Sequence, residues 1–338
     1  MSEQTQQPTP ELFFQTVNSF QRTAAVKAAI ELDIFTAIAE GKATAREVAE
    51  SRAASERGVR ILCDYLVISG LLTKTGAGYA LTADSALFLD RRSPAYMGGA
   101  VEFLLAPSLV EGFENLTEAV RRGGTAMPEG GTVADENPVW VKFARAMAPM
   151  MAMPARAIAA ASDDLAGRPL RVLDIAAGHG LFGIAFAQRF PEASVVALDW
   201  KSVLEVAKEN ARGAGVADRY ETIEGSAFES EFGAGYDVVL LTNFLHHFDP
   251  QTCEALLRKV RASLKDGGRA VTLEFIPDED RVSPPVPAAF SLTMLAGTPG
   301  GDAYTFPELR RMFDGAGFSR SELLELPATP QKLVVSFK

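Results

Sequence analysis

Residues 171–183 constrain the fold of this chain more than any other segment. Apolar residues run almost without a break over residues 171–175, which predicts a short buried strand. Small residues then predict a tight turn over 176–180, and apolar residues at helical spacing predict a helix over 181–189. A strand, a glycine-rich turn and a helix open a nucleotide-binding α/β sheet, in which backbone N–H groups and the helix N-terminus can approach a ligand closely.

Two kinds of ligand compete for this turn. Gly178, Gly180 and Gly183 satisfy the G-x-G-x-x-G pattern of dinucleotide-binding turns, which is a weak signal when it stands alone. Asp174 at the end of the strand favours another ligand, because a carboxylate there would repel a pyrophosphate but suits a ligand with an ammonium and a sulfonium group. The segment D-x-A-x-G-x-G resembles motif I of the methyltransferases that depend on S-adenosylmethionine (SAM), with Ala176 in place of the first glycine. A generic α/β turn is the remaining alternative.

The composition of the chain argues against several kinds of partner. Its 338 residues allow about two domains, and its 47% of hydrophobic residues are enough for real cores. A formal net charge of −10 argues against nucleic acid or an anionic membrane as the main partner. The polar N-terminus lacks the apolar core of a signal peptide, and no apolar run reaches membrane-spanning length. Cys63 and Cys253 are isolated and indicate neither a disulfide framework nor a zinc site, so we expect a cytoplasmic protein.

Residues 1–103 are predicted to form a mostly helical domain with a winged-helix arrangement. Three helical patterns precede a β-hairpin, over residues 11–39, 44–50, 55–69 and 71–82. The spacing of Thr44 and Glu47 predicts a capping box at the start of the second pattern. The predicted wing offers only Lys74, so the basic face that a DNA-binding module needs is missing. We therefore predict a domain for self-association, which makes the protein a homodimer.

Residues 104–167 are predicted to form a helical bridge. Large apolar side chains in its second half are spaced as one stripe: Trp140, Phe143, Met147, Met150, Met151 and Met153. Such a stripe is either ordinary core or one wall of an adaptable pocket for a flat organic molecule.

Strands and helices alternate over residues 168–338, which predicts an α/β domain with a parallel sheet. Strands are predicted at residues 171–175, 194–198, 220–223, 236–241, 269–275, 321–326 and 332–337. The loop before the last strand is so short that this strand must run antiparallel to its neighbour. Such an ending is unlike that of a dinucleotide dehydrogenase and is similar to the Rossmann-like seven-stranded sheet of the class I methyltransferases.

Residues that follow the second, third and fourth strands of this domain are predicted to bind the cofactor. Asp199 can accept hydrogen bonds from both ribose hydroxyls of an adenosine, and Trp200 offers a face on which adenine can stack. The other candidates follow the third or the fourth strand: Ser226, Ala227, Phe228, Thr242 and Asn243.

A pair of histidines follows the fourth strand. His246 and His247 lie just beyond the C-terminal end of a central strand, where ligands of open α/β folds bind. Imidazole titrates near neutrality, so it can take a proton from a hydroxyl that attacks a methyl group. The alternative is a structural or helix-capping pair. His179, in the glycine turn, is predicted to lie near the cofactor without a catalytic role.

Over nearly its whole length the sequence resembles the small-molecule O-methyltransferases of the plant caffeate, bacterial natural-product and melatonin-forming type. The run Leu-His-His-Phe at 245–248 aligns with their Leu-His-Asp-Trp, which implies that His246 is the general base. Their supporting glutamate falls on Glu274, and their second glutamate falls on Ala303, which cannot do the same work. Ser226 stands where plant members carry an aspartate that contacts the adenine amino group.

The same resemblance implies the cofactor and the partners. SAM would be the methyl donor, S-adenosylhomocysteine (SAH) the product, and a hydroxylated aromatic small molecule the acceptor, with no metal required. The helical bridge would contribute to the acceptor pocket. The pocket residues that the resemblance implies are Phe143, Met147, Met151, Phe290 and Met294.

Two other functions are compatible with the sequence. Because Ala303 removes the second carboxylate, the protein could bind SAM but methylate nitrogen or carbon, or catalyse a reaction without methyl transfer. A winged-helix regulator whose sheet senses a metabolite is disfavoured by the lack of a basic surface.

Overall fold

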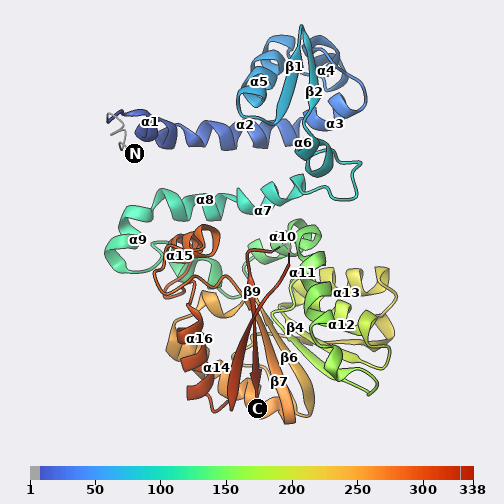
Figure 1. Ribbon diagram of the computed structural model, residues 1–338, viewed down its shortest axis with the longest axis vertical. Coiled ribbons are helices and arrows are strands. Elements are labelled where there is room, and N and C mark those ends of the chain that lie inside the picture. The colour runs from blue at the N-terminus through green and yellow to red at the C-terminus, as the bar shows by residue number, and fades with distance from the viewer. Residues whose placement is uncertain (1–7, 328) are drawn as a thin grey trace, which may run out of the picture. The chain divides into compact units, whose positions relative to one another are not determined.

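The computed structural model describes residues 8–327 and 329–338, and the contacts divide the chain into two compact units (Figure 1). The first unit extends to Val101, and the second spans Glu102–Lys338. In the described part of the chain, no helix combines the length and the apolar character needed to cross a membrane.

The N-terminal unit consists of short helices and one antiparallel hairpin, with apolar residues such as Phe35 and Leu66 in its core. Its elements are α1 (Glu11–Val17), α2 (Ser19–Glu31), α3 (Ile34–Ala39), α4 (Ala45–Ser51), α5 (Glu56–Ile68), β1 (Leu72–Thr75), β2 (Gly78–Leu81), α6 (Ala83–Phe88) and η1 (Gly98–Ala100). Thr44 and Glu47 form the predicted capping box at the start of α4.

The helical pattern over residues 11–39 is broken at two positions that the sequence pattern did not predict. Asn18 separates α1 from α2, and Asp33 separates α2 from α3 with a left-handed φ of 54°. Aspartate tolerates this conformation better than most residues, because its short polar side chain can bond locally.

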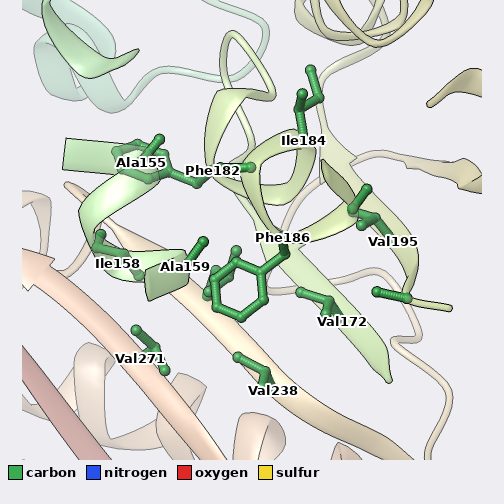
Figure 2. Close-up of a cluster of buried hydrophobic side chains, with 14 of the residues drawn as sticks. Ala155, Ile158, Ala159, Val172, Phe182, Ile184, Phe186, Val195, Val238 and Val271 are labelled. Atoms are coloured by element: carbon green, nitrogen blue, oxygen red, sulfur yellow. The ribbon is translucent and has the colours of Figure 1, made fainter. Parts of the chain in front are cut away.

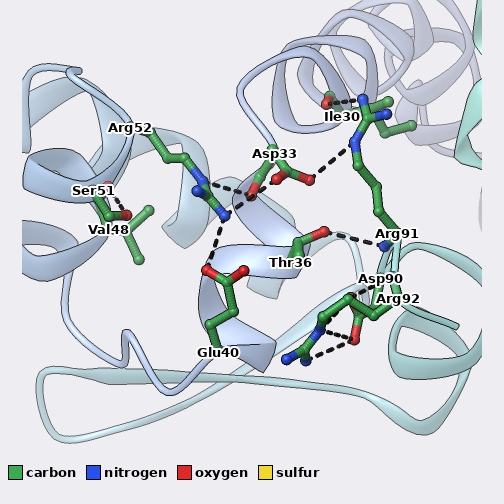
Figure 3. A network of polar contacts seen from close by, with 10 residues as sticks. All are labelled: Ile30, Asp33, Thr36, Glu40, Val48, Ser51, Arg52, Asp90, Arg91 and Arg92. Carbon is green, nitrogen blue, oxygen red and sulfur yellow. Dashed lines mark hydrogen bonds and ion pairs between the residues drawn. The ribbon is translucent and has the colours of Figure 1, made fainter.

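Ion pairs hold the Asp33 corner in place (Figure 3). Arg91 Nε lies 3.1 Å from Asp33 Oδ1, and Arg52 Nη2 lies 3.2 Å from Asp33 Oδ2. Arg52 also pairs with Glu40 at the end of α3. The carboxylate of Asp33 thus connects the helix corner to two arginines that are distant in the sequence, which fixes the path of the chain within this unit.

The second unit is a sheet covered by helices on both faces (Figure 1). Its strands are β3 (Arg171–Ile175), β4 (Ser194–Asp199), β5 (Tyr220–Glu224), β6 (Tyr236–Thr242), β7 (Leu264–Glu274), β8 (Arg320–Glu325) and β9 (Lys332–Phe337). Its helices are α7 (Val101–Leu104), which spans the boundary between the units, α8 (Pro107–Glu114), α9 (Leu116–Arg122), η2 (Pro128–Val133), α10 (Val139–Ala146), α11 (Ala148–Ala160), η3 (Asp163–Leu165), α12 (Leu181–Arg189), α13 (Lys201–Gly213), η4 (Ala217–Arg219), η5 (Leu245–His247), α14 (Pro250–Ser263), α15 (Pro285–Gly297) and α16 (Phe306–Gly315).

The seven strands lie in the order β5-β4-β3-β6-β7-β9-β8. Neighbouring strands from β5 to β7 pair in parallel, whereas β9 is antiparallel to both β7 and β8. The predicted seven-stranded α/β sheet with an antiparallel final strand is therefore confirmed. The short connection between β8 and β9 forces this arrangement, since a parallel pair would need a long crossover.

Each face of the sheet has its own hydrophobic core. Figure 2 shows Phe186 of α12 beside Ile158 and Ala159 of α11, above Val172, Val238 and Val271 of the sheet. The other face packs against α14 and α16 through a second cluster that includes Leu257 and Phe313. Because both faces are buried, the central strands are mostly apolar, as in other parallel sheets. It also leaves the C-terminal edge of the sheet as the place where polar side chains can gather.

Candidate active site

Four consecutive neighbours in the sheet, β4, β3, β6 and β7, bring the predicted site residues to one edge. Because these strands are parallel, the turns that follow them all emerge on the same side. The glycine turn follows β3, Asp199 ends β4, His246 follows β6 and Glu274 ends β7. The fold thus gathers residues that lie up to a hundred positions apart in the sequence.

The turn after β3 requires positive φ angles at Ala176 (53°), Gly178 (58°) and Gly180 (75°). Ala176 adopts this conformation without the freedom of a glycine, so it carries backbone strain. A Cβ on Gly180 would lie 2.6 Å from the Tyr220 hydroxyl, so glycine is needed there for space as well. Gly178 N donates to Asp199 Oδ2 at 2.8 Å, which ties this turn to the end of β4.

Asp174 lies one residue before the end of β3, and its side chain is fully buried rather than at an exposed tip. Its Oδ2 accepts a hydrogen bond from Gly183 N at 3.0 Å. Its Oδ1 is buried and has no hydrogen-bond partner among the described residues. Burial raises the pKa of Asp174 to about 8.

Asp199 closes the second side of the site. Its two oxygens accept hydrogen bonds from Gly178 N and Trp200 N, at 2.8 and 2.7 Å. Burial raises the pKa of Asp199 to about 6, and these two backbone donors oppose that rise. Each oxygen keeps a second lone pair for a ligand. Trp200 is half-buried and packs against a small apolar cluster that includes Val203 and Val206.

The turn after β5 is anchored to the same strand end. Gly225 N donates to the Asp199 carbonyl at 3.0 Å, and Ser226 Oγ accepts from Phe228 N at 3.2 Å. Ala227 is buried, Ser226 is half-buried and the Phe228 ring is 38% exposed. The structure therefore brings these three predicted residues near Asp199 through the backbone.

His246 and Glu274 form a buried pair. The Nδ1 atom of His246 lies 2.5 Å from Glu274 Oε2, with the side chains 4% and 3% exposed. Glu274 Oε1 accepts the N–H groups of Phe244 and Leu245 at 3.0 and 2.9 Å. One carboxylate thus fixes both the imidazole ring and the backbone that carries it. Among the described residues no hydrogen bond reaches Nε2 of His246, so this nitrogen remains free for a ligand.

His247 lies against His246, with ring centroids 4.2 Å apart, and meets the Trp140 ring edge-on at 5.1 Å. Its Nδ1 is buried and has no hydrogen-bond partner in the described part of the chain. Burial, together with the neighbouring His246, lowers the pKa of His247 well below its usual value. His247 is therefore neutral at physiological pH.

Aromatic side chains lie against His246 and against the glycine turn. The Phe290 ring lies 4.9 Å from the His246 ring and stacks on Phe275 at 4.2 Å. The Phe143 ring stacks on His179 at 6.1 Å, next to the glycine turn. Burial lowers the pKa of His179 to about 4, so its Nδ1 is free to accept the hydrogen bond from Leu181 N.

Asn243, one of the predicted residues at the end of β6, connects the turn that carries His246 to Met151 of α11. Asn243, with φ 56°, places its amide nitrogen 4.0 Å from Met151 Sδ, and its oxygen accepts from Gln331. Thr242 is buried at the end of the strand. Met147 and Met294 are also buried, at 8% and 4% exposure.

The segment after α15 contacts the backbone of the histidine turn. A Cβ on Gly301 would lie 2.2 Å from the His246 carbonyl oxygen, so only glycine fits there. Ala303 is fully buried and offers no polar group. The neighbouring Asp302 pairs with Arg281 at 3.0 Å. The second carboxylate is thus absent beside His246, and Glu274 is the single acidic partner among the described residues.

Sequence reasoning missed several supporting residues. Tyr220 is buried beside Gly180, Asn210 Nδ2 donates to the His179 carbonyl at 2.8 Å, and the Tyr304 hydroxyl donates to the Phe248 carbonyl at 2.6 Å. None of these residues belongs to a motif, because each reaches the site from a different strand, helix or loop. In the described residues no cluster of His, Cys, Asp or Glu could hold a metal ion.

The antiparallel β9 within a seven-stranded sheet, the glycine turn and the carboxylate after β4 define a class I SAM-dependent methyltransferase. Two family models agree, an O-methyltransferase domain over residues 113–319 and an O-methyltransferase dimerisation domain over residues 14–91. This chain belongs to the O-methyltransferase family, whose members use SAM as the methyl donor. The resemblance and the fold class predicted from the sequence are confirmed.

Individual relatives cover nearly the whole chain. The 3-hydroxy-5-methyl-1-naphthoate 3-O-methyltransferase of Streptomyces sahachiroi is 30% identical over 92% of this chain and 90% of its own length. A crystal structure from Nostoc punctiforme, assigned to the O-methyltransferases, is 57% identical with a TM-score of 0.96, and 98% and 100% of the two chains are covered. Human N-acetylserotonin methyltransferase in complex with SAM shares the fold, with 23% identity, a TM-score of 0.84 and coverage of 100% and 99%.

Proposed function

We propose that this chain transfers the methyl group of SAM to a phenolic hydroxyl of a small molecule, with His246 as the general base. The observation that carries the proposal is the buried contact of 2.5 Å between His246 Nδ1 and Glu274 Oε2. This contact leaves Nε2 as the only imidazole nitrogen that can take the proton of an acceptor. The carboxylate favours the tautomer with a proton on Nδ1 and stabilises the imidazolium that forms.

The glycine turn and the two aspartates fit the adenosyl part of SAM. The close approach of the backbone at Gly178 and Gly180, together with the unpartnered Asp174 Oδ1, supports a ligand that brings positive charge to this turn. Asp199 keeps acceptor capacity for ribose hydroxyls, and Trp200 and Phe228 offer aromatic faces for adenine. Bound SAM supplies an electrophilic methyl group on a sulfonium, which is why this protein needs to provide alignment and one base.

An aromatic acceptor is supported by the side chains near His246. Phe290 contacts the imidazole ring, while Trp140 contacts His247 and Phe143. Planar rings of this kind bind flat apolar molecules well. The relative from Streptomyces sahachiroi is named for a hydroxynaphthoate, which has the same chemistry. A phenol has a pKa of about 10 and is mostly protonated at neutral pH, so it needs a base.

The test is incubation of the purified protein with methyl-labelled SAM and matched aromatic acceptors. A phenol, its aniline analogue and its already methylated ether separate oxygen, nitrogen and carbon methylation by the position of the label. We expect label on the phenolic oxygen and none on the ether. Label on nitrogen or carbon would replace the proposal with the corresponding chemistry. Consumption of SAM without methyl transfer would indicate a different reaction at the same site.

We also propose that the protein works as a homodimer formed through its N-terminal unit. The family model of a dimerisation domain covers residues 14–91. Apolar side chains on α1 and α2 are more than half exposed, namely Leu12, Phe13, Phe14, Val17 and Phe20. Such a row is typical of a protein–protein interface. Light scattering should give twice the chain mass, and a monomer at micromolar concentration would contradict this proposal.

Binding of SAM should depend on pH. Burial raises the pKa of Asp174 to about 8 and that of Asp199 to about 6. Both carboxyl groups are therefore largely protonated below about pH 6, and Asp174 is still largely protonated between about pH 6 and pH 8. A cationic ligand favours the ionised carboxylates, so its binding should release protons. Affinity for SAM should therefore rise as pH rises through this interval, by up to about tenfold per pH unit for each proton released. Calorimetry in buffers of different ionisation enthalpy counts these protons.

The control for this prediction is SAH, which has the same amino and carboxyl groups but no sulfonium charge. Its affinity should change less over the same interval. A SAM affinity that stays constant or falls with rising pH would contradict the electrostatic role of the two aspartates, and the same pH dependence for both ligands would show that the sulfonium charge makes no difference to it.

A further inference from the structure

We propose that Lys259 is a positioning residue for the cofactor. Lys259 lies on α14, on one face of the sheet, and holds the turn after β5 in place. Lys259 belongs to no motif and lies far along the chain from the glycine turn. The inference rests on the proposed placement of the adenosyl group at Asp199 and at residues 225–228. The inference adds Lys259 as a residue that holds the turn against which the adenosyl group is proposed to bind, without contacting the ligand itself.

Lys259 directs its ammonium group at a single turn. Its Nζ donates to the carbonyl oxygens of Ala227, Phe228 and Ser230, at 3.3, 3.2 and 2.5 Å. An ammonium has three donors, so these carbonyls use all of them. The same ammonium lies 4.2 Å from the centroid of the Phe232 ring, which adds a cation–π contact just after the turn.

The charge of Lys259 has no carboxylate partner among the described residues. The preceding residue, Arg258, pairs instead with Glu254 on the exposed side of the same helix. Backbone carbonyl dipoles and one ring therefore balance the Lys259 charge. Three main-chain carbonyls of one turn take up the donors of Lys259, which indicates a structural contact with this turn.

The turn depends on this contact because it has few bonds of its own. The Ser226 carbonyl accepts the N–H groups of Glu229 and Ser230, at 3.2 and 2.9 Å. Gly225, with φ 136°, connects the turn to Asp199. The carbonyls of the following residues are held by Lys259. Loss of the ammonium would therefore free the segment that carries Ser226 and Phe228, while the His246–Glu274 pair would stay in place.

The test compares Lys259→Met with Arg258→Met, which removes an equal charge from the next position of the helix. In Lys259→Met we expect KM for SAM and Kd for SAH to rise about tenfold or more, as for loss of hydrogen bonds to a charged group. The kcat at saturating SAM should stay within about twofold, because the base is untouched. Backbone amides of residues 228–230 should exchange hydrogen faster. Arg258→Met should match the wild type in all of these measurements.

The outcomes separate this inference from the proposed function. Wild-type SAH affinity in Lys259→Met, or a fall in kcat with KM unchanged, would overturn the positioning role. An equal effect in Arg258→Met would also overturn it, since the cause would then be charge alone. If instead Asp199→Ala keeps wild-type SAH affinity, the proposed placement of the adenosyl group fails. Should Lys259→Met not fold, Lys259→Gln takes its place. Its amide keeps two donors on a shorter chain and loses the charge, so KM for SAM and Kd for SAH should rise by less than in the methionine variant, and no rise would overturn the positioning role.

Discussion

Replacement of His246 by alanine is expected to lower kcat by about 10²–10⁴-fold while SAH binds with wild-type affinity. The Nε2 atom of His246 is the nitrogen left free by the contact of Nδ1 with Glu274. Without it, a protonated phenol loses the nitrogen that we propose takes its proton, in a site where an aromatic ring contacts the imidazole. The residues proposed to hold the adenosyl group lie in the turns after β3 and β5 and at the end of β4, so the substitution should leave cofactor binding intact. Single-turnover kinetics and calorimetry with SAH measure the two effects separately.

Two comparisons make this prediction specific to the loss of a base. His246→Asn retains a donor toward Glu274 but cannot accept a proton, so it should be as slow as the alanine variant. Raising the pH toward about 10 should restore part of the rate in both variants, since the acceptor then ionises without help. Unchanged turnover at neutral pH in either variant would show that another group takes the proton, and His247 would be the first candidate because its ring lies 4.2 Å away.

The sheet could be predicted from the sequence because its signals are local. Unbroken apolar runs identify the buried strands, and the short loop before residue 332 determines the direction of β9. The positions of Asp199 and His246 follow from their place after strands. Glu274 was identified by resemblance alone, since no local pattern connects it to a histidine 28 residues earlier.

The missing parts of the prediction depend on tertiary packing. The burial of Asp174 follows from the approach of α12 at Gly183, where a Cβ would lie 3.0 Å from the carboxylate. No motif reports that approach, so the burial of Asp174 could not be predicted from the sequence. Lys259 was missed for a related reason, because a lysine in an amphipathic helix is normally interpreted as part of its solvated face. Only the structure shows that its donors converge on one turn.

The two carboxylate oxygens of Glu274 make different contacts. Its Oε2 holds the imidazole, while its Oε1 accepts backbone N–H groups of the turn that carries His246. Ala303 contributes no polar group here, and Asp302 is bound to Arg281. Both the orientation and the tautomer of His246 therefore depend on one side chain, which is 2% exposed.

Replacement of Glu274 by glutamine should lower kcat by about 10²-fold or more with little loss of stability. The amide oxygen can still accept the N–H groups of Phe244 and Leu245, so the turn should persist. The amide NH₂, however, would donate to Nδ1 of His246 and favour the tautomer with the proton on Nε2. In that tautomer Nε2 cannot accept the proton of a phenol. Kinetics at saturating SAM and urea unfolding measure the two quantities.

Glu274→Ala provides the contrast, because it also removes the oxygen that accepts the backbone N–H groups of Phe244 and Leu245. It should lower the free energy of unfolding by about 1–3 kcal/mol for each N–H group left buried without a partner, in addition to the loss of turnover. If the glutamine variant turned over like the wild type while the alanine variant unfolded easily, Glu274 would be a support of the backbone alone. The tautomer of His246 would then have to be set by another group, and the role of the buried pair in proton transfer would have to be abandoned.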